Sequence, residues 1–278
     1  MLPMGNLQVP RPGRLDGRTC LIVGGTGGIG LASARRFLEE GARVVVAGRS
    51  PEIGQRALDE LATLGSLWDF ALDLAEGERS VARLFVFALN VLGGRLDVLF
   101  HVAGISGRKL GDAALHECSS QAWDQVMQVN AQGAFLTNRE AARLMLQQPL
   151  DGDGLRGTVV NVGSVLDRSP SPEHFGTLAY TMSKGAVRAM TLAAAARYAP
   201  DRIRFNLLVP GLIDTPMAAR AASDARLQPY LCAKQPLAGG PGKAIDVAEA
   251  ALYLCEPASR FVTGTELIVD GGWCVSEG

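Results

Sequence analysis

The chain has 278 residues, of which 27 are basic and 28 acidic, and 47% are apolar. The near balance of charge argues against a nucleic-acid-binding surface, and no apolar run is long enough to span a membrane. Five cysteines without a C-x-x-C pair indicate reduced thiols and a cytoplasmic location. The histidines are scattered and have no cysteine partners, so no metal site is expected.

The first residues of the chain carry Pro3, Pro10 and Pro12 and contain no basic segment that leads into an apolar run. A signal peptide is therefore not expected. We predict a flexible leader over residues 1–15 and a folded chain from residue 16 onward.

The segment Cys20–Gly30 reads C-L-I-V-G-G-T-G-G-I-G, and a helical pattern follows it and stops at Gly41. A strand, a glycine-rich turn and a helix in this order present backbone N–H groups and a helix N-terminus to a phosphate. The alternative is a turn that only permits close packing. The spacing fits both G-x-G-x-x-G on Gly25, Gly27 and Gly30, and G-x-x-x-G-x-G on Gly24, Gly28 and Gly30.

Apolar strands alternate with helical patterns along the rest of the chain. After the strand at 20–23, strands are expected at 43–47, 66–72, 96–102, 158–162, 203–209 and 266–269. Helices are expected at 52–64, 78–92, 120–148, 177–198 and 244–256. Near-continuous apolar strands separated by helices predict a Rossmann-type, doubly wound α/β fold, with a seven-stranded parallel sheet and helices on both faces.

The residues after the second strand bear on the choice of cofactor, because ligands bind beyond the carboxyl ends of the strands in such a sheet. This strand is followed by Gly48 and Arg49, where a site for NAD would carry an acid. A guanidinium suits a 2′-phosphate, so NADP(H) is favoured. NAD(H) stays open because Glu52 is near in sequence and Arg49 could be a solvated surface residue.

The fifth strand runs into Ser164, and the sequence Tyr180-Thr-Met-Ser-Lys184 begins the next helical pattern. Tyr180 and Lys184 are four residues apart, so they share a helix face. The ammonium is expected to lower the pKa of the phenol from its usual value of about 10, which makes Tyr180 an acid or base near neutrality. Ser164 could then hold a substrate oxygen. A tyrosine and a lysine on a helix surface are the alternative.

From Asp16 to Trp273 the sequence resembles the short-chain dehydrogenase/reductase superfamily, in its single-domain branch. The resemblance implies hydride transfer that interconverts a secondary alcohol and a ketone, both small molecules. It implies that Tyr180 moves the proton and that Lys184 holds the nicotinamide ribose. Ser164 would orient the substrate, and Asn130, in V-N-A-Q-G, would anchor a water that connects Lys184 to solvent.

The resemblance also implies a set of cofactor-binding residues. Asp73 matches the aspartate near the adenine, and V-P-G-L-I-D-T-P-M matches the segment that faces the nicotinamide amide. The complete set is Gly24, Thr26, Gly28, Ile29, Gly30, Arg49, Asp73, Leu74, Ala103, Gly104, Tyr180, Lys184, Pro210, Gly211, Ile213 and Thr215.

Residues 16–278 are expected to form a single dinucleotide-binding catalytic domain. Residues 212–242 resemble the mobile lid of the family, and we call them the lid segment. The resemblance implies a homotetramer, with a dimer left open. The helical patterns at 120–148 and 177–198 are rich in alanine, which suits pairing with further copies of the chain.

Three residues depart from the family pattern. Val23 replaces a threonine before the first glycine, and His101 and Val102 replace the two asparagines of N-N-A-G. We expect these changes to alter how the turn is braced, with His101 as a structural substitute. They leave open a non-catalytic, nucleotide-binding scaffold of the same fold.

The loop over 165–179 is long and is expected to border the substrate pocket. Arg168 and His174 in this loop are candidates for contact with a polar or acidic substrate, and a solvated loop is the alternative. Trp273 is expected to anchor the core or an interface.

Overall fold

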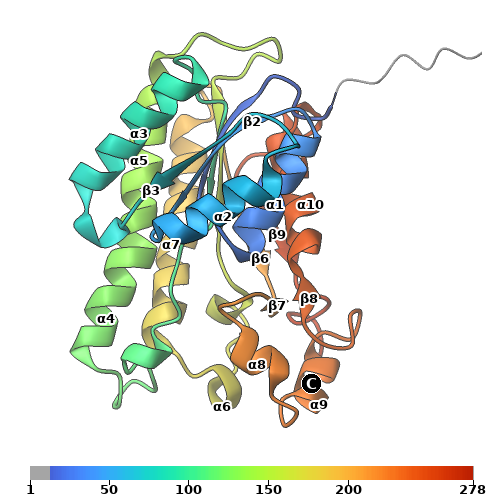
Figure 1. The fold of residues 1–278 in the computed structure, drawn as a ribbon. Coiled ribbons are helices and arrows are strands. Elements are labelled where there is room, and N and C mark those ends of the chain that lie inside the picture. Colours follow the sequence, from blue (N-terminus) through green and yellow to red (C-terminus); the bar gives the residue numbers. More distant parts are fainter. Residues whose placement is uncertain (1–12, 278) are drawn as a thin grey trace, which may run out of the picture.

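The structure is a computed structural model that describes residues 13–277, and it is built on a seven-stranded sheet with all strands parallel (Figure 1). The spatial order is β3-β2-β1-β4-β5-β6-β9, so the order reverses between β1 and β4. This arrangement confirms the predicted doubly wound fold. The strands are β1 (Thr19–Val23), β2 (Arg43–Gly48), β3 (Leu67–Ala71), β4 (Val98–His101), β5 (Gly157–Val162), β6 (Ile203–Pro210) and β9 (Glu266–Val269).

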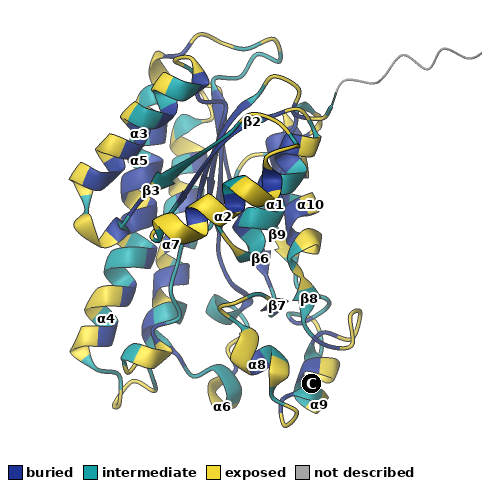
Figure 2. Cartoon of the chain, in the orientation of Figure 1, coloured by how far each residue is buried: buried dark blue, intermediate teal, exposed yellow. Residues whose placement is uncertain are grey.

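Helices cover both faces of the sheet (Figures 1 and 2). One face packs on α1 (Gly28–Glu39), α2 (Pro51–Leu61) and α10 (Ala244–Cys255). The other packs on α3 (Glu78–Leu92), α5 (Gly133–Gln147) and α7 (Leu178–Tyr198). Alternate strand side chains enter opposite clusters, as Ile22 and Leu21 do, because successive strand residues point to opposite faces.

The helix expected at 120–148 is present over residues 120–147, but a π-helical segment divides it into three parts. Helix α4 (Ser120–Val126) is followed by a π-helical segment (Met127–Gln132), which leads into α5. Within the π-helical segment the buried Asn130 side chain bonds to the backbone of Ile105, a contact outside the helix. Such bulges occur where a helix adjusts to place a side chain, and apolar periodicity does not reveal them.

The lid segment and the loop before α7 fold at the carboxyl end of the strands (Figure 1). Their side chains, among them Val165 and Leu231, share a third apolar cluster with Trp273, which follows β9. Short 3₁₀ turns lie at Leu74–Glu76, Arg108–Leu110, Val165–Asp167 and Pro257–Ser259. The remaining elements here are α6 (Pro172–Phe175), β7 (Ile213–Asp214), α8 (Ala219–Ser223), α9 (Gln228–Lys234) and β8 (Gly242–Lys243), with β7 and β8 paired.

Most of the expected leader, residues 1–12, lies outside the described residues. Residues 13–15 are described and belong to the folded body. Leu15 is fully buried, and its N–H donates to the carbonyl of Glu40 at 3.0 Å. Among residues 13–277 no helix has both the length and the apolarity to cross a membrane.

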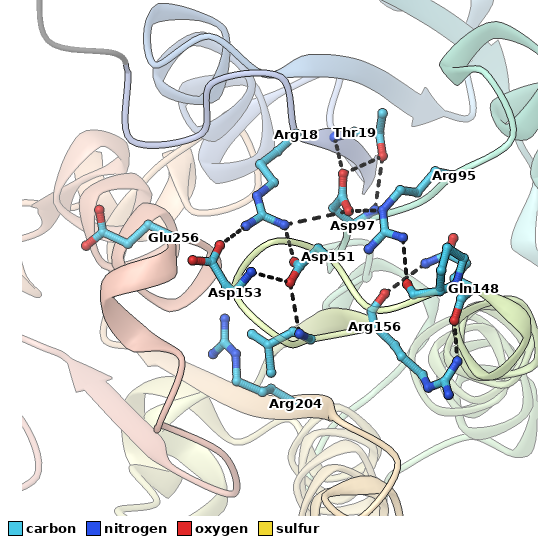
Figure 3. A network of polar contacts seen from close by, with 12 residues as sticks. Arg18, Thr19, Arg95, Asp97, Gln148, Asp151, Asp153, Arg156, Arg204 and Glu256 are labelled. Atoms are coloured by element: carbon cyan, nitrogen blue, oxygen red, sulfur yellow. Dashed lines mark hydrogen bonds and ion pairs between the residues drawn. The ribbon is translucent and has the colours of Figure 1, made fainter.

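Hydrogen bonds and ion pairs of charged side chains connect the amino ends of the central strands (Figure 3). The Asp97 carboxylate, just before β4, accepts hydrogen bonds from the backbone N–H and the hydroxyl of Thr19 in β1, both at 2.9 Å. It also accepts one from Arg95 Nε at 2.6 Å. Arg18 forms ion pairs with Asp151 and Asp153 and so joins the loop before β5 to this group.

We expect Asp97→Asn to lower the free energy of unfolding by about 2–3 kcal/mol, because it leaves the partly buried Arg95 guanidinium without its carboxylate partner and weakens the bonds to Thr19. Asp153→Asn is the matched control, since the Asp153 side chain is 30% exposed and that of Asp97 is 8% exposed. The control should cost less than about 1 kcal/mol. Urea unfolding followed by circular dichroism measures both, and equal losses would contradict the role of Asp97.

Candidate active site

A cavity of about 480 Å³ lies at the carboxyl ends of the central strands, beneath the lid segment. Its wall combines the glycine turn, the segments that follow β4, β5 and β6, and the first part of the lid segment. Most of the site residues expected from the sequence line it. They are Gly24, Thr26, Gly28, Ile29, Ala103, Gly104, Ser164, Tyr180, Lys184, Pro210, Gly211, Ile213 and Thr215.

The glycine turn packs so tightly that side chains are excluded at Gly24, Gly25 and Gly30. A Cβ at Gly25 would lie 2.8 Å from the carbonyl oxygen of Ile22. Gly24 has φ +87°, and a Cβ there would lie 2.6 Å from the backbone nitrogen of Ala103. A Cβ at Gly30 would overlap the carbonyl oxygen of Gly24. By contrast, a Cβ at Gly27 would meet no atom within 4 Å. Gly24 and Gly28 both adopt positive φ, +87° and +52°, whereas Gly25 and Gly27 do not, and this favours the interpretation with Gly24, Gly28 and Gly30 as the essential glycines.

The N-terminus of α1 faces this cavity and suits a phosphate group. Gly27 caps the helix without a side-chain hydrogen bond, and the first turn holds no acidic residue. Thr26, Gly28 and Ile29 line the cavity beside it. Free N–H groups and the positive end of a helix dipole favour an anion, so the residues present fit the pyrophosphate of a dinucleotide.

Four of the expected cofactor residues lie outside the cavity wall. Arg49 is exposed at the end of β2 and forms no ion pair within residues 13–277. The Asp73 carboxylate accepts a hydrogen bond from the N–H of Ala75 at 2.9 Å, and Leu74 is buried. Gly30 is enclosed within the turn itself.

Ser164, Tyr180 and Lys184 come together from the end of β5 and the start of α7. Ser164 and Tyr180 both line the cavity, and Ser164 Oγ accepts a hydrogen bond from the N–H of Leu166 at 3.2 Å. Lys184 Nζ donates to the carbonyl of Val162 at 2.9 Å and lies 5.7 Å from the centre of the Tyr180 ring. The start of α7 is fixed by Asp112, whose carboxylate accepts the N–H groups of Ala179 and Tyr180, both at 2.9 Å.

The expected lowering of the Tyr180 pKa is wrong for this structure. Burial raises the pKa of Tyr180, and the hydroxyl of Ser164 opposes that rise only in part. Burial also lowers the pKa of Lys184 to about 8. The spacing of four residues predicted the proximity correctly, but it carries no information on desolvation, which penalises the charged form of both groups.

Asn130 lies next to this group but is not part of the cavity wall. Its Oδ1 accepts from the N–H of Ile105 at 2.8 Å, and its Nδ2 donates to Ser183 Oγ at 3.0 Å. A Cβ at Gly104 would stand 3.2 Å from Asn130 Oδ1 and 3.5 Å from Lys184 Nζ. Gly104 therefore allows the backbone to pass between these two side chains.

The departures from the family pattern are accommodated within the core. His101 is buried, and its Nδ1 lies 2.9 Å from the hydroxyl of Thr137 on α5. Burial lowers the pKa of His101 to about 3, so its ring is neutral. His101 does not line the cavity, whereas Val102 does. The contacts of His101 are those of a structural residue that connects β4 to α5.

The two loop residues expected near the substrate do not line the cavity. Arg168 forms an ion pair with Glu266, and the His174 ring stacks on Tyr230 at 4.0 Å between ring centres. Sequence reasoning missed other lining residues, whose only signal was their position after a recognised motif. These are Ser106, Arg108, Phe175, Met217, Arg220 and Trp273. Trp273 is also buried, as expected for a core anchor.

A doubly wound parallel sheet with this glycine turn and this Ser-Tyr-Lys group defines a class of dinucleotide-dependent oxidoreductases. A family model described as enoyl-(acyl carrier protein) reductase matches residues 24–274. The chain belongs to the short-chain dehydrogenase/reductase superfamily. It is an enzyme of the alcohol dehydrogenase/ketoreductase type.

Similar proteins cover nearly the whole chain. The 2,5-dichloro-2,5-cyclohexadiene-1,4-diol dehydrogenase LinX of Sphingobium indicum is 32% identical over 94% of this chain and 98% of its own. Cyclopentanol dehydrogenase of Comamonas testosteroni is 32% identical over the same shares, 94% and 98%. A solved short-chain type dehydrogenase/reductase from Mycobacterium ulcerans superposes with a TM-score of 0.85 at 30% identity, over 95% of this chain and 92% of its own.

We expect the buried ammonium of Lys184 to make stability depend on pH. Its pKa is about 8 in the folded chain and 10.5 in the unfolded chain, so the unfolded chain binds more protons between these values. Stability from this residue therefore rises with pH, by about 1.5 kcal/mol between about pH 8 and 9.5.

Urea unfolding of the parent and of Lys184→Met at these two pH values measures the effect. Buried thiols and Tyr180 are present in both proteins, so their contributions to the pH dependence cancel when the two free energies of unfolding are subtracted. The parent should gain stability relative to the variant as pH rises, and a constant difference would contradict the lowered pKa.

Proposed function

We propose that the protein is an NADP(H)-dependent oxidoreductase that interconverts a secondary alcohol and a ketone on a small molecule. The observation that carries the proposal is the joining of Ser164, Tyr180 and Lys184 in one cavity with the glycine turn. The relatives named as cyclopentanol dehydrogenase and as a diol dehydrogenase support an alcohol as substrate. In this cavity Tyr180 Oη is the group that exchanges a proton with the substrate oxygen.

Four residues of this chain would each have a separate role in ketone reduction. Ser164 donates a hydrogen bond that orients the substrate oxygen beside the phenol. The raised pKa of Tyr180 keeps the phenol protonated at neutral pH, as a proton donor requires. The ammonium of Lys184 stabilises the phenolate that remains, and in alcohol oxidation the same phenolate accepts the proton. Asn130 would hold the surroundings of Lys184 in place through Ile105 and Ser183.

The nicotinamide dinucleotide, when bound, supplies or accepts the hydride. The turn of Gly24–Gly30 would hold its pyrophosphate, and Lys184 its nicotinamide ribose. Residues 210–215 would contact the nicotinamide amide. Asp73 and Leu74 would bind near the adenine, and Arg49 would pair with the 2′-phosphate, which is why we prefer NADP(H) over NAD(H).

We expect Tyr180→Phe to lower kcat by about 10³-fold, because it removes the proton donor and leaves the cavity shape. Cofactor affinity, measured by fluorescence titration, should stay within about twofold of the parent because the rest of the site is intact. Tyr230→Phe is the control, since its ring stacks on His174 and does not line the cavity.

Turnover is measured on a panel of ketones and alcohols with both cofactors. A Tyr180→Phe variant as fast as the parent would contradict the proposed acid. Cofactor binding without turnover of any panel member in the parent would favour the scaffold alternative.

We expect Arg49→Ala to weaken NADPH binding by about tenfold or more and to leave NADH binding unchanged, because only NADPH carries the 2′-phosphate. Arg56→Ala is the matched control, an exposed arginine of α2 that lies near Glu52. Fluorescence titration of both cofactors measures the effect. An unchanged affinity for NADPH would favour NAD as the natural cofactor.

We further propose a homotetramer in the cytoplasm. Phe135 on α5 and Met182 on α7 are 48% and 46% exposed, and such apolar residues suit burial against a second copy. A dimer is the alternative, and sedimentation velocity distinguishes the two. All five cysteines are free, as expected in a reducing compartment.

A further inference from the structure

Two arginines line the cavity beyond the Ser-Tyr-Lys group. Arg108 comes from the turn after β4, and Arg220 comes from α8 in the lid segment. The one other charged residue in the described wall is Lys184, so the wall holds three cations and no carboxylate. The chain as a whole has nearly equal numbers of acidic and basic residues. A cavity wall that carries only positive charge therefore favours the binding of an anion.

Neither arginine has a carboxylate partner within residues 13–277. Within the described part of the chain, the Arg108 side chain makes one hydrogen bond, to the carbonyl of His174 at 3.3 Å. Partial burial and the positive charge of Arg220 both lower the pKa of Arg108. The Asp112 carboxylate opposes this lowering only in part.

The acids near these arginines are already engaged. The Asp112 carboxylate accepts two N–H groups at the start of α7. Asp224, which acts on Arg220, binds the Arg226 guanidinium at 2.8 Å. A free anion would therefore be the first full partner of Arg108 and Arg220.

The cofactor phosphates have their own place at the glycine turn and the start of α1. Arg108 instead contacts the loop that leads into α7, on the side of Asp112 and Tyr180. Apolar side chains line the cavity as well, among them Leu166, Phe175 and Trp273. An anion at the two arginines would belong to a molecule whose remaining part is apolar.

We propose that the substrate is a ketone or secondary alcohol that carries a carboxylate, bound by Arg108 and Arg220. This inference rests on the proposed function, because it assigns the reacting oxygen to Ser164 and Tyr180. The carboxylate would connect the lid segment, through Arg220, to the body of the protein, through Arg108. Binding of the substrate would thus also close the lid segment over the cavity.

The test compares 4-oxocyclohexanecarboxylate with its carboxamide, which has the same shape and no charge. The parent should show a kcat/KM about 10²-fold higher for the acid, because charge-assisted hydrogen bonds to guanidinium are strong. Arg108→Gln and Arg220→Gln should each lose about tenfold or more of this preference through KM, with the amide unaffected. Lys234→Gln is the control, a lid cation outside the cavity wall whose Nζ donates to the carbonyl of Ser276 at 2.9 Å.

Equal kcat/KM for acid and amide in the parent would overturn the inference and leave the proposed function intact. So would an equal loss on both substrates in the two variants, or a preference for the matching phosphonate over the carboxylate.

If no ketone is turned over, the proposed function fails, and binding of cyclohexanecarboxylate to the NADP⁺-loaded protein decides the anion site separately. Calorimetric binding that Arg108→Gln abolishes supports the site. Binding that is absent, or unchanged by Arg108→Gln, overturns it. Cofactor affinity should be the same in all variants, and its loss would mean that these arginines bind the cofactor.

Discussion

The arrangement of the site depends on a buried ammonium at the end of β5. Lys184 is 5% exposed, and an unpaired charge at such a depth would cost several kcal/mol, on the order of 3–5, without a partner. Lys184 Nζ donates a hydrogen bond to the carbonyl of Val162, and the missing Cβ at Gly104 leaves room for the ammonium. The sheet therefore determines where Lys184 Nζ lies, and through α7 it also determines where Tyr180 lies.

Much of the fold could be predicted from local patterns in the sequence. The strands that end at Val23, Val162 and Val269 were predicted with those ends, because apolar runs stop where the chain leaves the buried sheet. The division of the helix at 127–132 could not be predicted, since it depends on a contact between Asn130 and a distant backbone. The same holds for Leu15, whose burial depends on the carbonyl of Glu40 and neighbouring side chains.

The candidate site was predictable where motif order carries the information. Ser164, Tyr180 and the glycine turn come together because the carboxyl ends of parallel strands share one edge. Protonation behaviour was not predictable, since the pKa of Tyr180 depends on how much water the folded chain removes. Arg108 and Arg220 were missed because a single arginine has no sequence signature, and only the fold brings two of them to one cavity.

The arginines named above have different partners at the two ends of the sheet, and this difference supports the proposed anion site. At the amino end Arg18 and Arg95 are bound to carboxylates, which joins β1, β4 and the loop before β5 and serves stability. At the carboxyl end Arg108 and Arg220 have no such partners in the described chain. Because Arg108 and Arg220 line the cavity, their charge stays available for a ligand that enters it.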